Sequence, residues 1–69
     1  MAAESDLEQL LQRLEREERD VSTRRARIHE RLASFPNSVL EEQERELSER
    51  RRALHDEIAK VRAALRSAE

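Results

Sequence analysis

The stretch Ser34-Phe35-Pro36-Asn37 decides the fold, because it is the one helix-breaking segment of the chain. Proline disfavours helical backbone geometry at the residue before it, and asparagine tolerates turn conformations. The sequences on both sides are long, lack glycine and further proline, and are rich in Ala, Glu, Arg and Leu. This composition favours helices and disfavours strands. We therefore expect two helices joined by a turn at this position.

Each expected helix begins with a capping box, in which a serine is followed three residues later by a glutamate. Ser5 with Glu8 and Ser38 with Glu41 have this spacing, which satisfies free N–H groups at a helix N-terminus. At about 1.5 Å per residue, each helix would be roughly 44 Å long. The predicted organisation is one unit over residues 1–69, with a helix over about 5–33, a turn at 34–37 and a helix over about 38–67.

An apolar residue recurs every seven residues in both halves of the chain, as in a coiled coil. The positions of this heptad seam are Leu7, Leu14, Val21, Ile28 and Phe35, then Leu40, Leu47, Leu54 and Val61. Since a short connection favours antiparallel packing, the predicted fold class is all-α, an antiparallel two-helix hairpin. A hairpin of this size is marginal alone. We therefore expect a dimer, a ligand or a partner to complete it, with exchanged helices if the hinge at Pro36 opens.

Length and composition exclude several classes of function. The chain has 69 residues, 36% of them apolar and 43% charged, so a multilayer globule is excluded. No residue near Met1 resembles a signal peptide, and no apolar run reaches the length of a membrane span. These features predict a cytoplasmic protein. The formal net charge of -2 does not predict direct binding to nucleic acid.

Catalysis and metal binding are not expected. The chain has no Cys or Tyr and no glycine-rich phosphate loop, and its serines lack the setting of an activated nucleophile. His29 and His55 each lack a second histidine four residues away, which is the spacing that a helical metal site needs. We therefore predict that the chain is not an enzyme, has no catalytic residues and holds no metal.

A repeat offset by 26 residues relates the two expected helices, aligning residues 14–33 with residues 40–59. This offset is not a multiple of seven, so the heptad period alone does not explain it. Four polar identities are spaced four, three and four residues apart, within an arc of roughly 60° on a helix. We call these side chains the polar stripe: Glu18, Ser22, Arg25 and His29 in the first helix, and Glu44, Ser48, Arg51 and His55 in the second.

The hairpin is expected to place the two halves of the polar stripe at the same levels. If the chain turns between Pro36 and Asn37, residues whose numbers sum to about 73 lie opposite each other. The predicted pairs are Ser22 with Arg51, Arg25 with Ser48, Glu18 with His55, and His29 with Glu44. This pseudo-two-fold arrangement suits a ligand or partner that is itself two-fold symmetric. A belt of arginines in the same region predicts a local anion site: Arg24, Arg25, Arg27, Arg50, Arg51 and Arg52.

The residue types of the polar stripe complement a guanine nucleotide. Arginine presents a planar fork suited to phosphate or to the O6 and N7 acceptors of guanine, and it can stack on purines. Glutamate can accept hydrogen bonds from guanine N1 and N2, while serine or histidine can donate to phosphate oxygen. The eight residues of the polar stripe are therefore the candidate ligand-binding residues.

The polar stripe resembles the motif of bacterial RsiG-type anti-sigma factors. That family carries Glu-x-x-x-Ser-x-x-Arg-x-x-x-Gln-x-x-x-Asp on each of two antiparallel helices. The positions that match are Glu18, Ser22 and Arg25, and then Glu44, Ser48 and Arg51. The positions that depart are His29 and His55 in place of Gln, and Ala33 and Ala59 in place of Asp. The resemblance covers about half the chain, from Glu18 to Ala59.

The resemblance implies a ligand and a partner. In the family, the paired helices bind cyclic di-GMP, a two-fold symmetric guanine dinucleotide, as a pair of molecules. The loaded protein then holds a flagellar-type sigma factor, WhiG, away from core polymerase. By this resemblance, we expect Arg25 and Arg51 to engage guanine edges or faces. We expect Glu18 and Glu44 to accept hydrogen bonds from guanine, and Ser22 and Ser48 to contact phosphate. The secondary contacts are expected from His29 and His55.

A second hypothesis from a different class of function stays open at this point. The chain could be a ligand-free coiled-coil adaptor that pairs with itself or with a partner helix through its heptad seam. In that case the polar stripe is a solvated flank whose Glu and Arg side chains form ordinary ion pairs.

Overall fold

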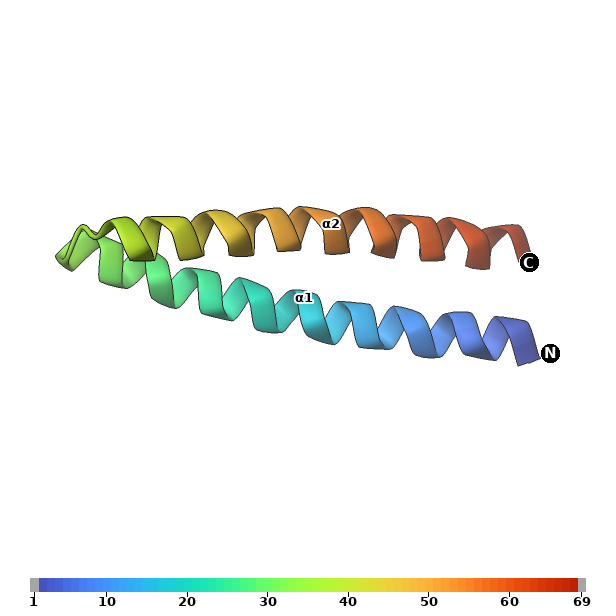
Figure 1. Cartoon of the computed structure of the whole chain (residues 1–69). Helices are drawn as coiled ribbons and strands as arrows, with labels where there is room; N and C mark the ends of the chain where they lie inside the picture. The colour runs from blue at the N-terminus through green and yellow to red at the C-terminus, as the bar shows by residue number, and fades with distance from the viewer. Residues whose placement is uncertain (1, 69) are drawn as a thin grey trace.

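The chain forms two long helices that run antiparallel to each other (Figure 1). The computed structural model describes the backbone of residues 2–68 and the side chains of residues 5–67, so both ends of the predicted unit 1–69 lie outside the described residues. Helix α1 spans Ala2–Ser34 and helix α2 spans Ser38–Ala68. The Cα positions extend over 51 × 14 × 13 Å. The predicted all-α antiparallel hairpin is confirmed.

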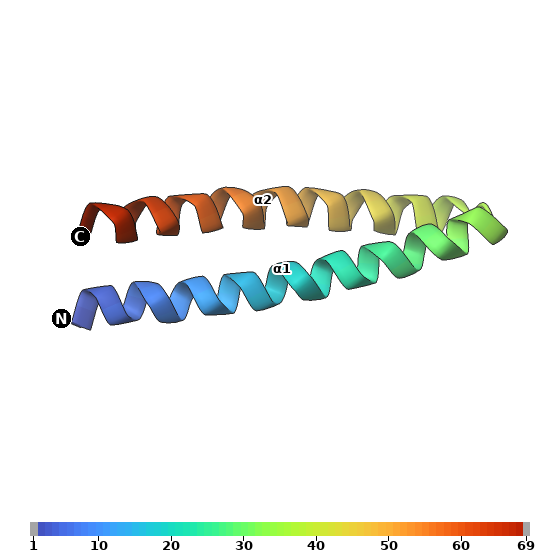
Figure 2. The ribbon, with the colours of Figure 1, turned by 180° about the vertical axis from the view of Figure 1, so that it is seen from behind.

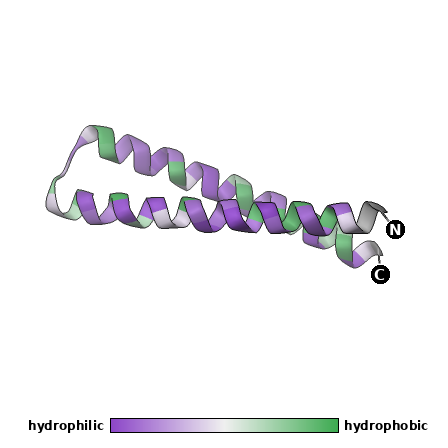
Figure 3. Cartoon of the chain, turned by 90° about the horizontal axis from the view of Figure 1, so that it is seen from below, coloured by the Kyte–Doolittle hydropathy of each residue, from purple (hydrophilic) through white to green (hydrophobic). Residues whose placement is uncertain are grey.

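The two helices cross at a shallow angle. In Figures 1 and 2 they are close at the turn and separate towards the termini. In Figure 3, viewed from below, they overlap near the termini and separate towards the turn. A shallow crossing accounts for both views and is typical of helices that pack through a heptad seam. Each helix therefore presents slightly different residues to its neighbour at the two ends of the hairpin.

The beginning of α1 differs from the predicted one. The prediction that a capping box at Ser5 and Glu8 begins this helix is wrong, because α1 begins at Ala2 and Ser5 lies inside it. The residues that precede Ser5 are Ala2, Ala3 and Glu4, which are strong helix formers. The helix therefore extends upstream of the sequence signal that was expected to start it.

Asn37, not Ser38, caps the second helix. The side-chain oxygen of Asn37 accepts hydrogen bonds from the backbone N–H groups of Val39 at 2.7 Å and Leu40 at 3.3 Å. Its backbone carbonyl accepts the first helical hydrogen bond of α2, from Glu41 at 2.9 Å. The predicted cap at Ser38 is therefore one residue too late. None of the described residues has a positive φ, so this turn does not require glycine.

The apolar core lies in the half of the hairpin that contains the termini. Leu54 is 1% exposed and packs with the other buried residues, which are Leu14, Val21, Ile58 and Val61. Partly buried leucines extend this core: Leu7, Leu10, Leu11, Leu47 and Leu65. Most positions of the predicted heptad seam therefore face the partner helix. Ile58, which is not one of the predicted heptad positions, is also part of this buried core.

Phe35 does not belong to the seam, although the heptad spacing predicts it. Its side chain is 75% exposed, and that of Val39 on the other side of the turn is 60% exposed. Phe35 is the first residue after α1, which ends at Ser34. The helical period that predicts a seam position therefore does not extend to it. The tip of the hairpin is therefore apolar and accessible.

Two further features of the chain bear on its surroundings. Over the residues that the structure describes, neither helix has an apolar run long enough to cross a membrane. A homodimer, including one that exchanges helices at Pro36, stays a prediction. The same seam contacts would form within one chain or between two.

We predict that Asn37→Ala lowers the free energy of unfolding by about 1 kcal/mol, because it removes the side-chain acceptor for two N–H groups at the start of α2. Ser38→Ala is the matched control and should change it by no more than a few tenths of a kcal/mol. Urea unfolding followed by circular dichroism at 222 nm measures both variants. A larger loss for Ser38→Ala than for Asn37→Ala would contradict the assigned cap.

Candidate functional site

The polar stripe lies beside the apolar seam and joins the two helices. Its members come from α1 (Glu18, Ser22, Arg25 and His29) and from α2 (Glu44, Ser48, Arg51 and His55). The structure brings them together in two clusters, each of which contains residues from both helices. We call them the turn-side cluster, made of Arg25, His29, Glu44 and Ser48, and the end-side cluster, made of Glu18, Ser22, Arg51 and His55.

The turn-side cluster is built around Glu44. Its Oε1 atom accepts hydrogen bonds from Ser48 Oγ at 2.7 Å and, across the helix interface, from Arg25 Nε at 3.1 Å. Arg25 Nε also donates to Ser48 Oγ at 2.8 Å. His29 Nε2 lies 3.0 Å from the same glutamate oxygen. One carboxylate therefore holds an arginine, a histidine and a serine in fixed positions.

The end-side cluster repeats this arrangement around Glu18, with a looser arginine. Glu18 Oε1 accepts a hydrogen bond from Ser22 Oγ at 2.8 Å, and His55 Nε2 lies 3.0 Å from it. Arg51 Nε is 3.5 Å from the same oxygen, which is long for a hydrogen bond. This buried nitrogen has no hydrogen-bond partner among the described residues. The end-side cluster therefore leaves a donor of Arg51 unsatisfied.

The observed contacts agree with three of the four predicted level pairs. Arg25 meets Ser48, His29 meets Glu44, and Glu18 meets His55. The fourth pair, Ser22 with Arg51, makes no hydrogen bond within the described residues, because Ser22 donates to Glu18 instead. Each cluster thus contains one Glu, one Ser, one Arg and one His in equivalent places, and a pseudo-two-fold axis relates the two. The arginines differ, because Arg25 forms hydrogen bonds and Arg51 Nε does not.

Hydrogen bonding favours the ionised form of both central glutamates. The pKa of Glu44 falls from 4.5 to about 2, mainly because Ser48 donates to it, with further contributions from His29 and Arg25. The pKa of Glu18 is also lowered, first by Ser22 and then by His55. Partial desolvation opposes the shift in both cases. Each cluster therefore has a carboxylate anion at its centre at neutral pH.

The six arginines expected to form one belt are divided between different faces. Only Arg25 and Arg51 belong to the polar stripe. On the other side of the seam, Arg24 pairs with Asp20 at 3.2 Å, and Arg50 pairs with Glu17 of the facing helix. The pKa of Arg50 is raised, above all by its hydrogen bonds to that glutamate. Adjacent residues on a helix are about 100° apart, so neighbours in the sequence such as Arg24 and Arg25 reach opposite flanks.

A hollow of about 390 Å³ adjoins the end-side cluster. Its lining includes Glu18, His55 and Ala59, and also Arg19, Glu15 and Arg62. Arg62 Nη2 bonds Glu15 Oε2 at 3.2 Å across the interface. Sequence reasoning did not select these last three residues. The numbers of Glu15 and Arg62 sum to 77, whereas residues directly opposite each other were expected to sum to about 73. The difference of four residues is about one helical turn. Allowing one turn on either side of the expected sum would have found this pair.

Comparison with known proteins adds no relative: no protein-family model, no curated protein and no solved structure matches the chain. The polar stripe therefore has to be interpreted from its own chemistry. Ionised Glu44 accepts a hydrogen bond from Arg25 Nε, whereas Arg51 Nε lies 3.5 Å from Glu18 without forming one. The terminal nitrogens of both guanidinium groups form no hydrogen bond within the described residues, and such nitrogens are donors suited to oxyanion or carbonyl acceptors.

We predict that Glu44 makes the stability of the hairpin depend on pH between about 4.5 and about 2. Its pKa is lower in the folded state than its ordinary value of 4.5, so in this interval the unfolded chain binds more protons. The stabilisation is complete above about pH 4.5 and is lost as the pH falls through about 2. The difference in thermal midpoint between wild type and Glu44→Gln should therefore shrink from pH 6 to pH 2.

Glu42→Gln provides the matched control. Glu42 is exposed and makes no ion pair or side-chain hydrogen bond within the described residues. Its midpoint should track that of the wild type across the same pH range. A constant difference between wild type and Glu44→Gln from pH 6 to pH 2 would contradict the role given to this carboxylate.

Proposed function

We propose that the polar stripe binds cyclic di-GMP and that the loaded hairpin sequesters a flagellar-type sigma factor of the WhiG class. The observation that supports this most is the presence of two matched Glu, Ser and Arg sets on one side of an antiparallel hairpin. A pseudo-two-fold surface suits a two-fold symmetric dinucleotide. The same residues carry the resemblance to RsiG-type anti-sigma factors. The protein would act in the cytoplasm by occupancy, and no chemical step is assigned to it.

In this proposal Arg25 and Arg51 are the main ligand contacts. Their Nη nitrogens engage the O6 and N7 acceptors or the faces of guanine. The Nε atom of Arg51 has no hydrogen-bond partner within the described residues, so this side chain gives up little hydrogen bonding when it turns outwards to a ligand. The separation of the two arginines into two clusters is consistent with a pair of ligand molecules, one for each half of the stripe.

The other stripe residues exchange their present bonds for ligand contacts. Glu18 and Glu44 are ionised, so they can accept hydrogen bonds from guanine N1 and N2. Ser22 and Ser48 can turn their hydroxyl groups from these glutamates towards phosphate. The secondary contacts are assigned to His29 and His55, which are 53% and 50% exposed. Ala59, at a position where the family carries Asp, lines the hollow beside the end-side cluster and leaves space there.

We predict that isothermal titration detects binding of cyclic di-GMP to the wild-type chain at tens of micromolar ligand, and that Arg25→Ala/Arg51→Ala abolishes it. The double variant Arg24→Ala/Arg50→Ala is the control, since it makes the same change in net charge on the opposite flank. It should bind like wild type. Binding should weaken as salt rises, because the contacts are largely ionic, and GTP and cyclic di-AMP should bind less well.

Two results would argue against this assignment. One is a wild-type titration without heat under the same conditions. The other is an equal loss of binding in the Arg24 and Arg50 control. Arg25→Lys/Arg51→Lys separates folding from recognition, because it keeps the charges while removing the planar fork. It should retain the helical circular dichroism of the wild type and bind the nucleotide much more weakly.

We further predict that a purified flagellar-type sigma factor co-sediments with the hairpin only when cyclic di-GMP is present. The ligand would bridge the two proteins or complete the surface that the sigma factor contacts. Analytical ultracentrifugation with and without nucleotide measures the complex, and the Arg25→Ala/Arg51→Ala variant is the negative control. Equal co-sedimentation in the absence of nucleotide would contradict regulation by ligand occupancy.

A specific observation also favours the second candidate function, a ligand-free coiled-coil adaptor. Glu18 and Glu44 already hold their serine, histidine and arginine neighbours, as in an ordinary network between helices. Under this function the stripe stabilises the hairpin, and the apolar surface binds another helix or a second copy. The nucleotide titration separates the two functions, because an adaptor would give no heat with any of the three nucleotides.

A further inference from the structure

The hollow beside the end-side cluster contains ionic side chains that do not belong to the polar stripe. Glu15 of α1 and Arg62 of α2 line it from opposite helices and form an ion pair, with 3.2 Å between Arg62 Nη2 and Glu15 Oε2. Arg19 lines it as well and forms no ion pair within the described residues. Ile58 and Ala59 add apolar surface to the lining. The hollow therefore combines an apolar surface with hydrogen-bond donors and acceptors.

The charges that line the hollow balance. Glu15 and Glu18 are negative, Arg19 and Arg62 are positive, and His55 completes the polar lining. A balanced lining gives no preference for a free anion. It suits a neutral planar group that packs against apolar side chains while its edges both donate and accept hydrogen bonds. Guanine is such a group, because its N1 and N2 atoms donate whereas O6 and N7 accept.

The order of acceptors and donors on guanine matches the pair formed by Glu15 and Arg62. O6, N1 and N2 follow one another along one edge of the base, so an arginine bound to O6 and a glutamate bound to N1 and N2 lie side by side. Arg62 and Glu15 are neighbours of this kind, and their hydrogen bond uses only one oxygen of the carboxylate. Adenine has an acceptor at N1, which would face the carboxylate of Glu15 unfavourably. The pair therefore favours guanine over adenine.

The polar stripe accounts for only one guanine of each ligand molecule. Each cluster has a single Glu and a single Arg, which is one set for reading a guanine. Cyclic di-GMP carries two guanines. Glu18 and His55 belong both to the end-side cluster and to the lining of the hollow. A ligand held by the end-side cluster is therefore next to a second set, Glu15 and Arg62.

We propose that the hollow binds the second guanine of the cyclic di-GMP molecule held by the end-side cluster. Glu15 accepts hydrogen bonds from N1 and N2 of this base, and Arg62 donates to its O6. Arg19 contacts a phosphate of the same molecule, since it is the lining arginine without an ion pair. The inference rests on the proposed function and extends it, because these three residues belong neither to the polar stripe nor to the RsiG-type motif.

The turn-side cluster lacks an equivalent set. The offset of 26 residues that relates the two helices pairs Glu15 with Glu41 and Arg62 with Pro36. Glu41 lies in the first turn of α2, but Pro36 lies in the connection between the helices and has no side-chain donor. The end-side half of the hairpin therefore reads both bases of its ligand, whereas the turn-side half reads one.

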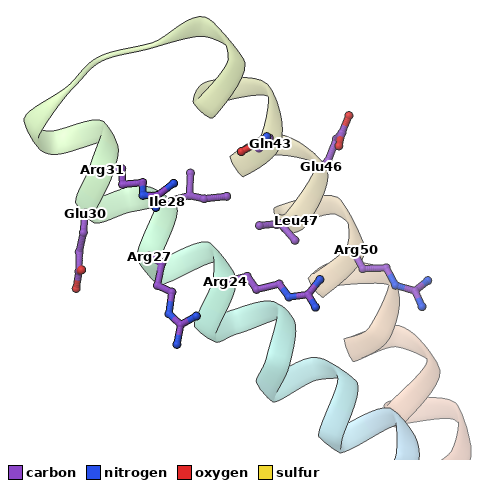
Figure 4. Close-up of a pocket in the computed structure, with 9 residues that line it drawn as sticks. All are labelled: Arg24, Arg27, Ile28, Glu30, Arg31, Gln43, Glu46, Leu47 and Arg50. Carbon is purple, nitrogen blue, oxygen red and sulfur yellow. The ribbon is translucent and has the colours of Figure 1, made fainter.

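The other concave surface of the hairpin is remote from the polar stripe. It is a groove of about 730 Å³ near the turn, where Ile28 and Leu47 point towards each other (Figure 4). None of the stripe residues lines this groove within the part of the chain that the structure describes. Arg50 lines it from α2 and pairs with Glu17 across the interface. The pair of Glu17 and Arg50 is therefore a matched control for the pair of Glu15 and Arg62.

A mixed dinucleotide tests the second guanine site. Cyclic GMP-AMP keeps one guanine for the polar stripe and presents adenine to the hollow. In isothermal titration, the tighter binding step of the wild type should favour cyclic di-GMP over cyclic GMP-AMP by about tenfold or more, since paired contacts to a base edge discriminate by this amount. Glu15→Ala/Arg62→Ala should remove most of this preference and leave the helical circular dichroism unchanged.

Two further comparisons keep the test specific. Glu17→Ala/Arg50→Ala removes the same residue types from the same two helices on the opposite flank, so it should keep the preference of the wild type. Ala59→Leu fills the hollow without changing an ionic group and should weaken the binding of cyclic di-GMP severalfold. Ala33→Leu makes the same change at the equivalent position of the turn-side half, and should leave the tighter binding step unchanged.

Three results would overturn the proposal while the proposed function stands. The first is equal affinity of the wild type for cyclic di-GMP and cyclic GMP-AMP. The second is a full preference in Glu15→Ala/Arg62→Ala. The third is an equal loss of preference in Glu17→Ala/Arg50→Ala, which would indicate a general response to the loss of an ion pair. A wild-type chain that binds neither dinucleotide would instead refute the proposed function, and the assignment of the hollow with it.

Discussion

The position of the chain reversal determines which residues of α1 and α2 lie opposite each other, and the rest of the structure depends on it. Asn37 caps α2 through its side chain immediately after Pro36, so the second helix begins at a defined residue. Every cross-helix contact of the polar stripe follows from this register. A turn displaced by one residue would rotate the stripe of α2 by about 100° away from its partners. The short turn segment thus controls contacts between residues that are 23 positions apart in the sequence, such as Arg25 and Ser48.

The apolar seam divides the surface of the hairpin into two flanks with different chemistry. On one flank, Glu18 and Glu44 organise serine, histidine and arginine side chains into two related clusters. On the other, arginines and glutamates surround a groove whose apolar residues are Ile28 and Leu47. A two-helix protein has no interior large enough to enclose a ligand. Its functions have to be carried by these flanks.

The loosely held arginine of the end-side cluster is the main departure from symmetry. Arg25 donates to both Glu44 and Ser48, whereas Arg51 approaches only Glu18, at 3.5 Å. The shallow crossing of the helices changes their spacing along the hairpin, so equivalent side chains cannot meet in the same way on both halves. The hollow beside Ala59 is at this looser half. The two halves of the stripe therefore differ in how much of their hydrogen bonding is already complete.

The amino-acid sequence by itself determined the two helices, their antiparallel pairing, the face that holds the stripe and most of its cross-helix partners. These features depend on the period of an α-helix and on the position of one proline, and both can be read from the order of residues. Only the tertiary structure decided that Ile58 is buried while Phe35 is exposed, that Asn37 is the cap, and that Arg24 and Arg50 lie apart from Arg25 and Arg51. Those outcomes depend on how the two helices cross and on which of several neighbouring side chains forms a given hydrogen bond or ion pair. Neither is a property of local sequence.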